Sequence, residues 1–385
     1  MSILEILLLS LLALYTLQTL VILIGSYLTT DQTNMSSPPV SILVAARNEE
    51  NNISRCLESL IQQDYPPERY EIIVINDHST DNTVRLVNQL RNRIPSLRLL
   101  SLADFPPPSV SLAGKQQALE VGFRQAKSEI ILCTDADCIV PPNWVKSMAS
   151  FFQKNSGLVF ALTQIEPRGS SSYRLLNIIQ RLDLIFLFTV AGGVANLGIP
   201  LSCMGNNMAM RKSVYQEIGG YTRIGFSITE DFALVQWIRH KTRWKIHFNS
   251  SPSAVVSTNP ESSWSAFIHQ KKRWLWGGLA DSKLMILLLL PLTLFHLILL
   301  LTFFAPINRN LGMLIFGIKG LLDFLILFRT TFQFSLAKHW LLFFPVFELY
   351  FLLGTIFLGF ARLWGTPHII WKGRNLHAIK HTLLF

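Results

Sequence analysis

Long apolar segments at both ends of the chain enclose a polar middle. The first apolar run, Ile3 to Ile24, is long enough to cross the ~30 Å hydrocarbon core of a bilayer. It lacks the basic start and the small-residue cleavage site of a secretory signal peptide, so we predict a permanent N-terminal anchor. Polar and charged residues concentrate between Asp31 and Lys283. Further apolar runs follow, over Leu284–Pro306, Leu311–Phe328 and Leu341–Leu363.

The C-terminal runs give two conflicting indications of topology. If all of them cross the membrane, the C-terminus lies on the side opposite the polar middle. A basic tail instead favours the cytoplasmic side; its residues are Arg362, Lys372, Arg374 and Lys380. One run is therefore expected to be re-entrant or interfacial. The middle run is the weakest span because Lys319 and Asp323 lie one helical turn apart in it, and we expect them to form an intrahelical ion contact rather than a functional relay.

Short buried runs alternate with helical patterns in the first half of the polar middle. Val40–Ala46, Glu71–Ile75 and Glu129–Thr134 are apolar runs of strand length. A helical pattern follows the first run through Leu60, and another extends from Lys115 to Lys127. Strands that alternate with helices predict an α/β fold with a parallel sheet and right-handed crossovers.

The second half of the polar middle is less regular. Leu158–Gln164 is predicted as a strand. Leu175–Ile199 is apolar but interrupted by Arg181, Asp183 and two glycines, so we expect a helix that lies in the membrane interface. Two further helices are predicted, over Thr229–His240 and Ser262–Gly277.

The composition agrees with a membrane protein. Half of the residues are hydrophobic and only 15% are charged, whereas about a quarter are charged in a typical soluble protein. The net charge is +10, but no zinc finger, RNA-recognition motif or basic helix indicates nucleic-acid binding. Basic residues beside the apolar runs, such as Lys271 and Lys272, are expected to meet anionic lipid or a diphosphate. The four cysteines fit no zinc or disulfide framework, which favours free thiols in a reducing cytosol.

Two aspartates directly follow the third predicted strand, in Thr134-Asp135-Ala136-Asp137. In an extended chain residues two apart point the same way, so both carboxylates are expected to face one site. Mg²⁺ and Mn²⁺ favour such ligands and complete their shells with water and phosphate oxygens. An acidic turn before a helix is the alternative. Their position favours the metal site, because ligands bind beyond the carboxyl ends of parallel strands.

Asp77 and Lys115 are candidates for contacts to a nucleotide. Asp77 follows the second predicted strand, where a carboxylate can accept hydrogen bonds from a ribose or a base. A turn or helix-cap role is an equal alternative for it. Lys115 follows Gly114 and is in a position to contact a phosphate, although a lysine there is more often a solvated residue at a helix start.

Thr229-Glu230-Asp231 opens a predicted helix. These residue types commonly cap helices and complement the helix dipole. The functional alternative makes Asp231 a general base that removes the proton of an acceptor hydroxyl. Gln270, Arg273 and Trp274 share a face of the next helix, where Arg273 can neutralise a diphosphate and Trp274 can stack on a sugar or nucleotide. The same stretch is also typical of a basic helix that leads into a membrane.

These motifs together resemble a family. They are Val40-Ser-Ile-Leu-Val-Ala-Ala-Arg-Asn-Glu-Glu50, Asn76-Asp77, Asp135-Ala-Asp137, Gly205-Asn206-Asn207, Thr229-Glu230-Asp231 and Gln270-x-x-Arg273-Trp274. In this order, over Pro39 to Gly278, they resemble the processive-type family 2 glycosyltransferases. Relatives include the cellulose, hyaluronan and poly-N-acetylglucosamine synthases and the ceramide glucosyltransferases. The resemblance implies a GT-A type, Rossmann-like domain and a transfer that inverts the anomeric centre.

The resemblance also implies roles for single residues. Asp77 would hold the nucleoside of a nucleotide-diphosphate sugar, and Asp135 would line the donor pocket. Apart from the resemblance, Lys115 is also expected among the donor-binding residues. Asp137, together with Asp135, would bind a divalent cation, Mg²⁺ or Mn²⁺, on the diphosphate. Asp231 would be the catalytic base. The residues expected around the diphosphate and the acceptor are Glu230, Gln270, Arg273, Trp274 and Asn206.

The resemblance and the apolar runs divide the chain into parts. We expect an N-terminal anchor over residues 1–30, a cytoplasmic GT-A domain over 38–280, and a membrane region over 281–385 with two or three helices and the basic tail. The protein is thus predicted to be a multi-pass membrane protein.

The acceptor is the least defined part of the prediction. A polymer synthase that secretes its product must build a channel, usually from more helices than are predicted here, so we expect one sugar to be added to a membrane lipid. Extension of a glycan such as poly-N-acetylglucosamine, with a helper subunit, is the alternative. A non-catalytic sugar-nucleotide sensor is the second alternative. A transporter ranks last, because the C-terminal runs contain few polar residues.

Overall fold

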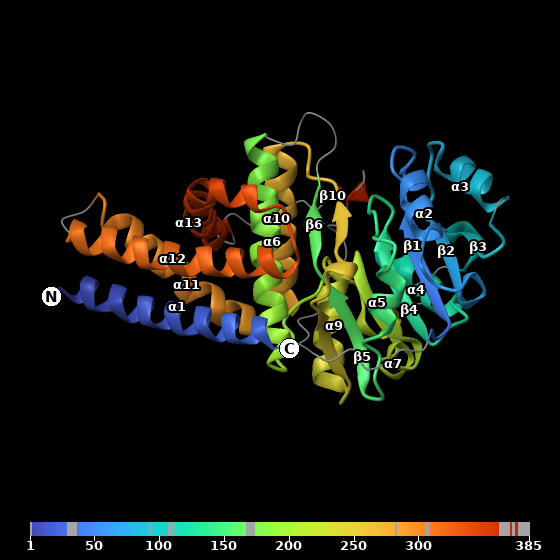
Figure 1. Cartoon of the computed structure of the whole chain (residues 1–385), viewed down its shortest axis with the longest axis horizontal. Coiled ribbons are helices and arrows are strands. Elements are labelled where there is room, and N and C mark those ends of the chain that lie inside the picture. The colour runs from blue at the N-terminus through green and yellow to red at the C-terminus, as the bar shows by residue number, and fades with distance from the viewer. Residues whose placement is uncertain are drawn as a thin grey trace.

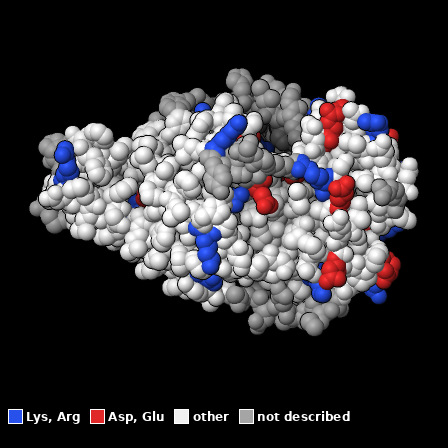
Figure 2. Space-filling model, turned by 45° about the horizontal axis from the view of Figure 1, so that its top comes forward, with Lys and Arg blue, Asp and Glu red and all other residues white. Residues whose placement is uncertain are grey.

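A sheet-containing body and a bundle of apolar helices make up the chain, with two long helices between them (Figure 1). This computed structural model describes residues 2–28, 37–92, 94–106, 110, 112–166, 174–281, 283–304, 308–361, 370–371 and 374–375. On the face shown in Figure 2, charged side chains gather over the sheet-containing body, and the narrow end formed by apolar helices carries few of them. The polar middle and the apolar ends of the sequence are therefore separated in space.

The main sheet has seven strands in the order β3-β2-β1-β4-β7-β5-β8. The first four in this order are parallel, and β7 is antiparallel to both of its neighbours. This confirms the predicted α/β class with a mainly parallel sheet. The strands are β1 (Val40–Ala46), β2 (Tyr70–Asn76), β3 (Leu97–Ser101), β4 (Ile130–Asp135), β5 (Ser156–Ala161), β7 (Asn207–Arg211) and β8 (Lys245–Asn249).

Alternate side chains of the strands enter two apolar layers, one on each face of the sheet. Leu43 of β1 lies in the same cluster as Phe123, whereas its neighbours Ile42 and Val44 lie in a cluster with Leu57. Burial on both faces explains why these strands are continuous apolar runs in the sequence. The helices on the two faces include α4 (Lys115–Gln125) and α6 (Leu175–Asn196) on one side, and α2 (Ile53–Ile61) and α5 (Trp144–Ala149) on the other. The remaining helices of this body are α3 (Thr83–Arg91), α7 (Lys212–Glu217), α8 (Gly220–Ile224) and α9 (Glu230–Lys241).

The strand expected over 158–164 is interrupted. β5 ends at Ala161, and β6 (Thr163–Ile165) begins after Leu162 and pairs with β9 (Val256–Thr258) in a separate two-stranded sheet. The side chain of Asn207 donates hydrogen bonds to the carbonyl oxygens of Leu162 and Ala254 at 2.8 Å. These bonds give partners to backbone carbonyl groups at the point where the chain leaves the main sheet.

Four helices of the described chain are long and apolar enough to cross a membrane. α1 (Ile3–Tyr27) confirms the helix expected near the N-terminus, and α6 is the second. The other two are α12 (Arg309–Gln333) and α13 (Phe344–Ala361) with the 3₁₀ turn before it. α11 (Lys283–Leu301) is apolar from Ile286, but this stretch is shorter. Arg362, Lys372 and Lys380 of the basic tail lie outside the described residues, so its side of the membrane stays a prediction.

Helix α6 is one unbroken helix despite its charged residues and glycines. It runs across the ends of α1 and α12, between the apolar bundle and the sheet (Figure 1). Its charges have partners, since Arg181 lies 4.6 Å from the centre of the Trp340 ring and Asp183 is paired with Lys271. It is largely buried in protein, and its expected place in a membrane interface stays a prediction.

The glycines of α6 allow close packing rather than ending the helix. A Cβ on Gly193 would lie 2.6 Å from the carbonyl oxygen of Ile22, and one on Gly25 would lie 2.0 Å from that of Gly193. The backbones of α1 and α6 therefore cross in direct contact, as small residues permit in membrane helices.

We expect Gly25→Ala to destabilise the protein by about 1–3 kcal/mol, because the added methyl group meets backbone that cannot rotate away. The measurement is the thermal unfolding midpoint in detergent. Gly317→Ala is the matched control, since a Cβ on this glycine of α12 meets no atom within 4 Å. Equal midpoints for the two variants would contradict the close crossing.

The ion contact predicted between Lys319 and Asp323 is present and belongs to a larger buried cluster. Lys319 Nζ lies 2.7 Å from Asp323 Oδ2 and 2.5 Å from Glu348 Oε1 of α13. The Tyr15 hydroxyl of α1 donates a hydrogen bond to Asp323. Lys319 and Asp323 are fully buried. The cluster thus joins three apolar helices by polar contacts.

Candidate functional site

A pocket of about 910 Å³ lies beyond the carboxyl ends of β1 and β4. The sheet provides one side of it, and α6 and α10 (Trp264–Asp281) provide another. It contains most of the residues singled out from the sequence: Lys115, Asp135, Asp137, Asn206, Glu230, Asp231, Gln270, Arg273 and Trp274. Residues far apart in the chain are therefore gathered where a mainly parallel sheet is expected to bind its ligand.

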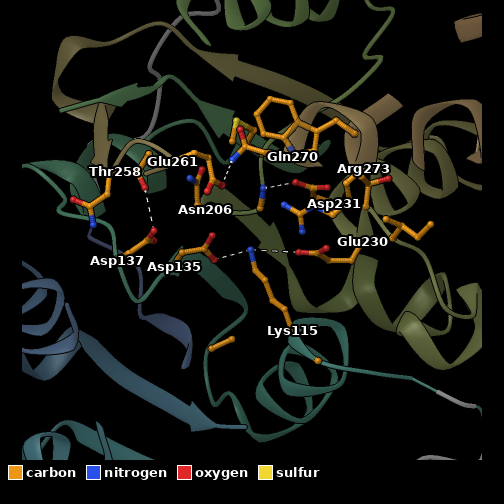
Figure 3. A pocket seen from close by; sticks show the side chains of 18 of the residues that line it. Lys115, Asp135, Asp137, Asn206, Glu230, Asp231, Thr258, Glu261, Gln270 and Arg273 are labelled. Carbon is orange, nitrogen blue, oxygen red and sulfur yellow. Dashed lines mark hydrogen bonds and ion pairs between the residues drawn. The ribbon is translucent and has the colours of Figure 1, made fainter. Parts of the chain in front are cut away.

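Lys115 lies between the carboxylates of Asp135 and Glu230 in the pocket (Figure 3). Its Nζ is 2.6 Å from Asp135 Oδ1 and 3.3 Å from Glu230 Oε1. Burial alone lowers the pKa of Lys115, but the nearby carboxylates, led by that of Asp135, hold it well above its usual value. Lys115 is therefore a permanent positive charge in the pocket rather than the solvated lysine that was the alternative.

Asp231 lies in the first turn of α9 and faces the pocket. Its Oδ2 accepts a hydrogen bond from the Gly205 N–H at 2.7 Å, and its Oδ1 accepts one from the Phe232 N–H at 2.8 Å. Burial, followed by the charge of Glu230, raises the pKa of Asp231 to about 6, and Lys115 partly opposes this shift. A carboxylate with such a pKa is ionised at neutral pH and accepts a proton more readily than an ordinary aspartate.

Gly205 and Asn206 come from the segment that enters β7. Since β7 is antiparallel to β4, its first residues lie at the same edge of the sheet as Asp135. Asn206 lines the pocket and accepts a hydrogen bond from the Thr163 hydroxyl at 2.9 Å. A Cβ on Gly205 would lie 3.2 Å from Lys115 Nζ, so glycine leaves room for the lysine and donates its N–H to Asp231.

Asp135 and Asp137 both line the pocket, but the extended geometry expected for them is wrong. β4 ends at Asp135 and the chain then turns, yet both side chains line the pocket, as expected. Asp135 contacts Lys115, and Asp137 Oδ2 accepts a hydrogen bond from the Thr258 hydroxyl at 3.4 Å (Figure 3).

The donor set at this turn fits a divalent cation that also binds a diphosphate. Magnesium and manganese sites often use one or two carboxylates and take their other oxygens from water and phosphate. Asp135 and Asp137 supply such carboxylates at the pocket surface. No group of three or more His, Cys, Asp or Glu side chains suited to a metal occurs among the described residues. The two carboxylates would thus leave most of the shell to the ligand and water.

The three residues predicted to share a face of α10 all line the pocket. Gln270 donates a hydrogen bond from Nε2 to Glu261 Oε1 at 2.8 Å. The backbone of Glu261 is held in turn by Gln180 of α6, through hydrogen bonds of 2.8 Å and 3.1 Å. Arg273 is half-buried and lines the same pocket as Asp231 and Glu230 (Figure 3).

Asp77 and Asn207 of the quoted motifs lie outside the pocket. Asp77 is buried beside Arg47 and is not among the residues that line the pocket, whereas Arg47 is. Arg47 Nη1 donates a hydrogen bond to the Asp77 carbonyl oxygen at 2.9 Å. Asn207 accepts a hydrogen bond from the Trp144 indole at 2.9 Å in the core. The role of Asp77 in nucleoside binding stays a prediction.

Several pocket residues were not assigned a role from the sequence. Glu261 and Gln180 could not be recognised as pocket residues from the sequence, because polar residues of these types occur throughout the middle of the chain. Asp183 stands out in the sequence only as a charged residue within an apolar run. Its partner Lys271 is 88 positions away, so the pair is visible only in the folded chain.

Comparisons with known proteins agree with this site. A family model described as glycosyl transferase family 21 matches residues 4–383. A beta-monoglucosyldiacylglycerol synthase of Synechocystis sp. is 27% identical over 65% of the chain and 50% of its own length. A poly-beta-1,6-N-acetyl-D-glucosamine synthase of Staphylococcus epidermidis is 27% identical over 62% of the chain and 54% of its own length. The chain thus spans about half the length of these curated relatives.

A solved structure resembles most of the chain. The mannosyltransferase PcManGT of Pyrobaculum calidifontis, in complex with GDP-Man and Mn²⁺, has a TM-score of 0.57. The match covers 90% of this chain and 99% of that one at 18% identity. At this identity the likeness supports the GT-A fold alone.

Proposed function

The chain belongs to glycosyl transferase family 21, and from this we propose that it transfers a sugar from a nucleotide-diphosphate donor to a lipid held at the membrane surface. The predicted kinship with membrane glycosyltransferases is confirmed by the family and by the relatives. One relative is a beta-monoglucosyldiacylglycerol synthase, which supports a lipid acceptor.

One structural observation carries the proposal. The pocket that contains Asp231 is bounded by α10, and α10 packs directly on α13 of the apolar bundle. Phe267 of α10 packs near Tyr350 of α13, with ring centres 5.9 Å apart. A lipid head group at the edge of the apolar bundle would therefore lie beside the helix that bounds the pocket of Asp231.

The proposed chemistry is a single displacement. The acceptor hydroxyl oxygen forms a bond to the anomeric carbon while the bond from that carbon to the diphosphate breaks. The proton of the hydroxyl passes to Asp231, and the diphosphate leaves with the bonding electrons. Because attack comes from the face opposite the leaving group, the configuration inverts. Lys115 and Arg273 line the pocket as positive charges that stabilise the leaving diphosphate.

A divalent cation is proposed as the cofactor, held by Asp135 and Asp137. When bound, it would neutralise charge on the diphosphate. The donor set fits, and the neighbour PcManGT was solved with Mn²⁺. We expect EDTA to abolish sugar transfer and added Mn²⁺ or Mg²⁺ to restore it; full activity in EDTA would contradict the cofactor.

The domain limits and the topology also belong to the proposal. We infer a GT-A domain over 38–280 on the cytoplasmic side, between an anchor over 1–30 and a membrane region over 281–385. The apolar helices at both ends support membrane association. Asp77 is proposed to act on the nucleoside through Arg47, which lies between Asp77 and the pocket.

The pH dependence of transfer is expected to report the Asp231 carboxylate. The wild-type kcat/KM should fall below about pH 6, because the base must be deprotonated to accept the proton. Lys115 lowers this pKa, so Lys115→Met should move the acid limb up by roughly one unit. Glu230 raises it, so Glu230→Gln should move the limb down. Both variants are expected to lose activity, so the experiment compares only the pH midpoint of the acid limb of kcat/KM. Shifts in the same direction would contradict this account.

A polysaccharide synthase is the second candidate, because a poly-beta-1,6-N-acetyl-D-glucosamine synthase is among the relatives. The deciding experiment incubates the detergent-purified protein and Mn²⁺ or Mg²⁺ with a panel of UDP- and GDP-sugars and a membrane lipid extract. Nucleotide release and products are followed by mass spectrometry. A single glycolipid supports the proposal, and a ladder of oligomers supports the synthase. Nucleotide binding without any product would support the sensor.

A further inference from the structure

Lys271 of α10 lies between the pocket and the apolar bundle. Its ammonium group is buried and forms an ion pair with Asp183 of α6. It also lies 4.3 Å from the centre of the Trp274 ring and 5.2 Å from that of Phe267. All four side chains line the pocket.

Asp183 continues these contacts into the apolar bundle. Its second oxygen, Oδ1, accepts a hydrogen bond from the Tyr350 hydroxyl of α13 at 3.1 Å. Tyr350 also packs against the cluster of Leu176, Ile179 and Phe267. A continuous set of contacts therefore leads from α13 through Asp183 and Lys271 to the ring of Trp274.

The ammonium group has little freedom within these contacts. Burial lowers the pKa of Lys271, and Asp183 counteracts this, so the charge depends on its partner. A desolvated cation attracts the face of an aromatic ring most strongly. Lys271 thus lies over the Trp274 ring and is paired with Asp183, which is itself hydrogen-bonded to Tyr350.

We propose that Lys271, Asp183 and Tyr350 form a positioning network that holds the Trp274 ring on the acceptor side of the pocket. Acceptor binding then depends on how the apolar helix α13 is seated against α6 and α10. This inference rests on the proposed function, because it requires an acceptor that enters beside α10. None of the three residues is assigned a chemical step.

The test compares steady-state constants for lipid acceptor and sugar donor. Lys271→Met alone leaves Asp183 buried without its cation, and we expect it to lower the thermal unfolding midpoint. Lys271→Met with Asp183→Asn removes both charges and should recover most of that loss. In this double variant the acceptor KM should rise about tenfold while the donor KM stays unchanged, because the cation has left the Trp274 ring.

Tyr350→Phe provides a milder variant that removes only the hydroxyl, and we expect a roughly threefold higher acceptor KM. Lys154→Met is the matched control, since Lys154 is an exposed lysine before β5 that does not line the pocket. A wild-type acceptor KM in a folded double variant and in Tyr350→Phe would overturn the network. A second result would also overturn the network: donor KM and acceptor KM that change equally and in proportion to the loss of stability. A purely structural role of these residues predicts that result.

The two proposals fail in different ways. If the wild-type protein glycosylates no lipid, the proposed function is refuted and the network has no acceptor to position. If the wild-type protein glycosylates a lipid and the variants leave its acceptor KM unchanged, only the network is refuted.

Discussion

Replacing Asp231 by asparagine is expected to lower the kcat of sugar transfer by about 10²–10⁴-fold, the usual contribution of a general base. Asparagine keeps the size of the side chain and an oxygen that accepts the Gly205 N–H, so the fold should be preserved. It cannot accept the proton of the acceptor hydroxyl. The measurement is initial rate against acceptor concentration, with donor binding followed separately.

Donor affinity should change little in Asp231→Asn, because the sugar donor is held mainly by other residues of the pocket. Asp64→Asn is the matched control: this exposed carboxylate pairs with Lys146 at 3.6 Å on the surface and does not line the pocket. We expect wild-type rates from it. An Asp231→Asn variant that retains more than about a tenth of the wild-type kcat would exclude Asp231 as the base.

Replacing Lys319 by methionine is expected to destabilise the apolar bundle by about 3–5 kcal/mol. The change leaves the carboxylates of Asp323 and Glu348 buried without their shared cation. Methionine has a similar length, so the loss comes from charge rather than from packing. Thermal unfolding in detergent, followed by circular dichroism, measures it.

The companion variant removes the carboxylate charges as well. Lys319→Met with Asp323→Asn and Glu348→Gln contains no buried charge in this cluster and should recover most of the stability. The exposed Leu321→Met on the same helix should behave like the wild type. If Lys319→Met alone unfolds at the wild-type temperature, the cluster contributes nothing to the stability of the bundle.

The strands at the centre of the sheet were predictable because burial on both faces makes them continuous apolar runs. β1 over Val40–Ala46 matches its prediction at both ends. α6 was harder, since its charges are satisfied by Trp340 and Lys271, which are far away in the sequence. The role of its glycines could not be read from the sequence either, because they permit a close contact with the backbone of α1, which is far away in the chain.

The pocket was predictable to the extent that its residues follow strands or open helices. Asp135 ends β4 and Asp231 lies in the first turn of α9, so topology alone places both near the edge of the sheet. The local backbone geometry was not predictable: Asp137 lies in the turn that follows β4 rather than in an extended strand. The contacts of Lys115 with Asp135 and Glu230 depend on three separate segments and could not be read from any one of them.

The antiparallel strand β7 determines the order in which the protein can mature during synthesis. The ribosome makes β4 and β5 before α6, and β7 only after it. β7 is hydrogen-bonded to both β4 and β5, so these two strands cannot be joined in one sheet until residues 207–211 have emerged from the ribosome. By then α6 has been translated and is able to pack on α1. The nascent chain therefore acquires Gly205, and with it the hydrogen bond to Asp231, only after the boundary helix has been made.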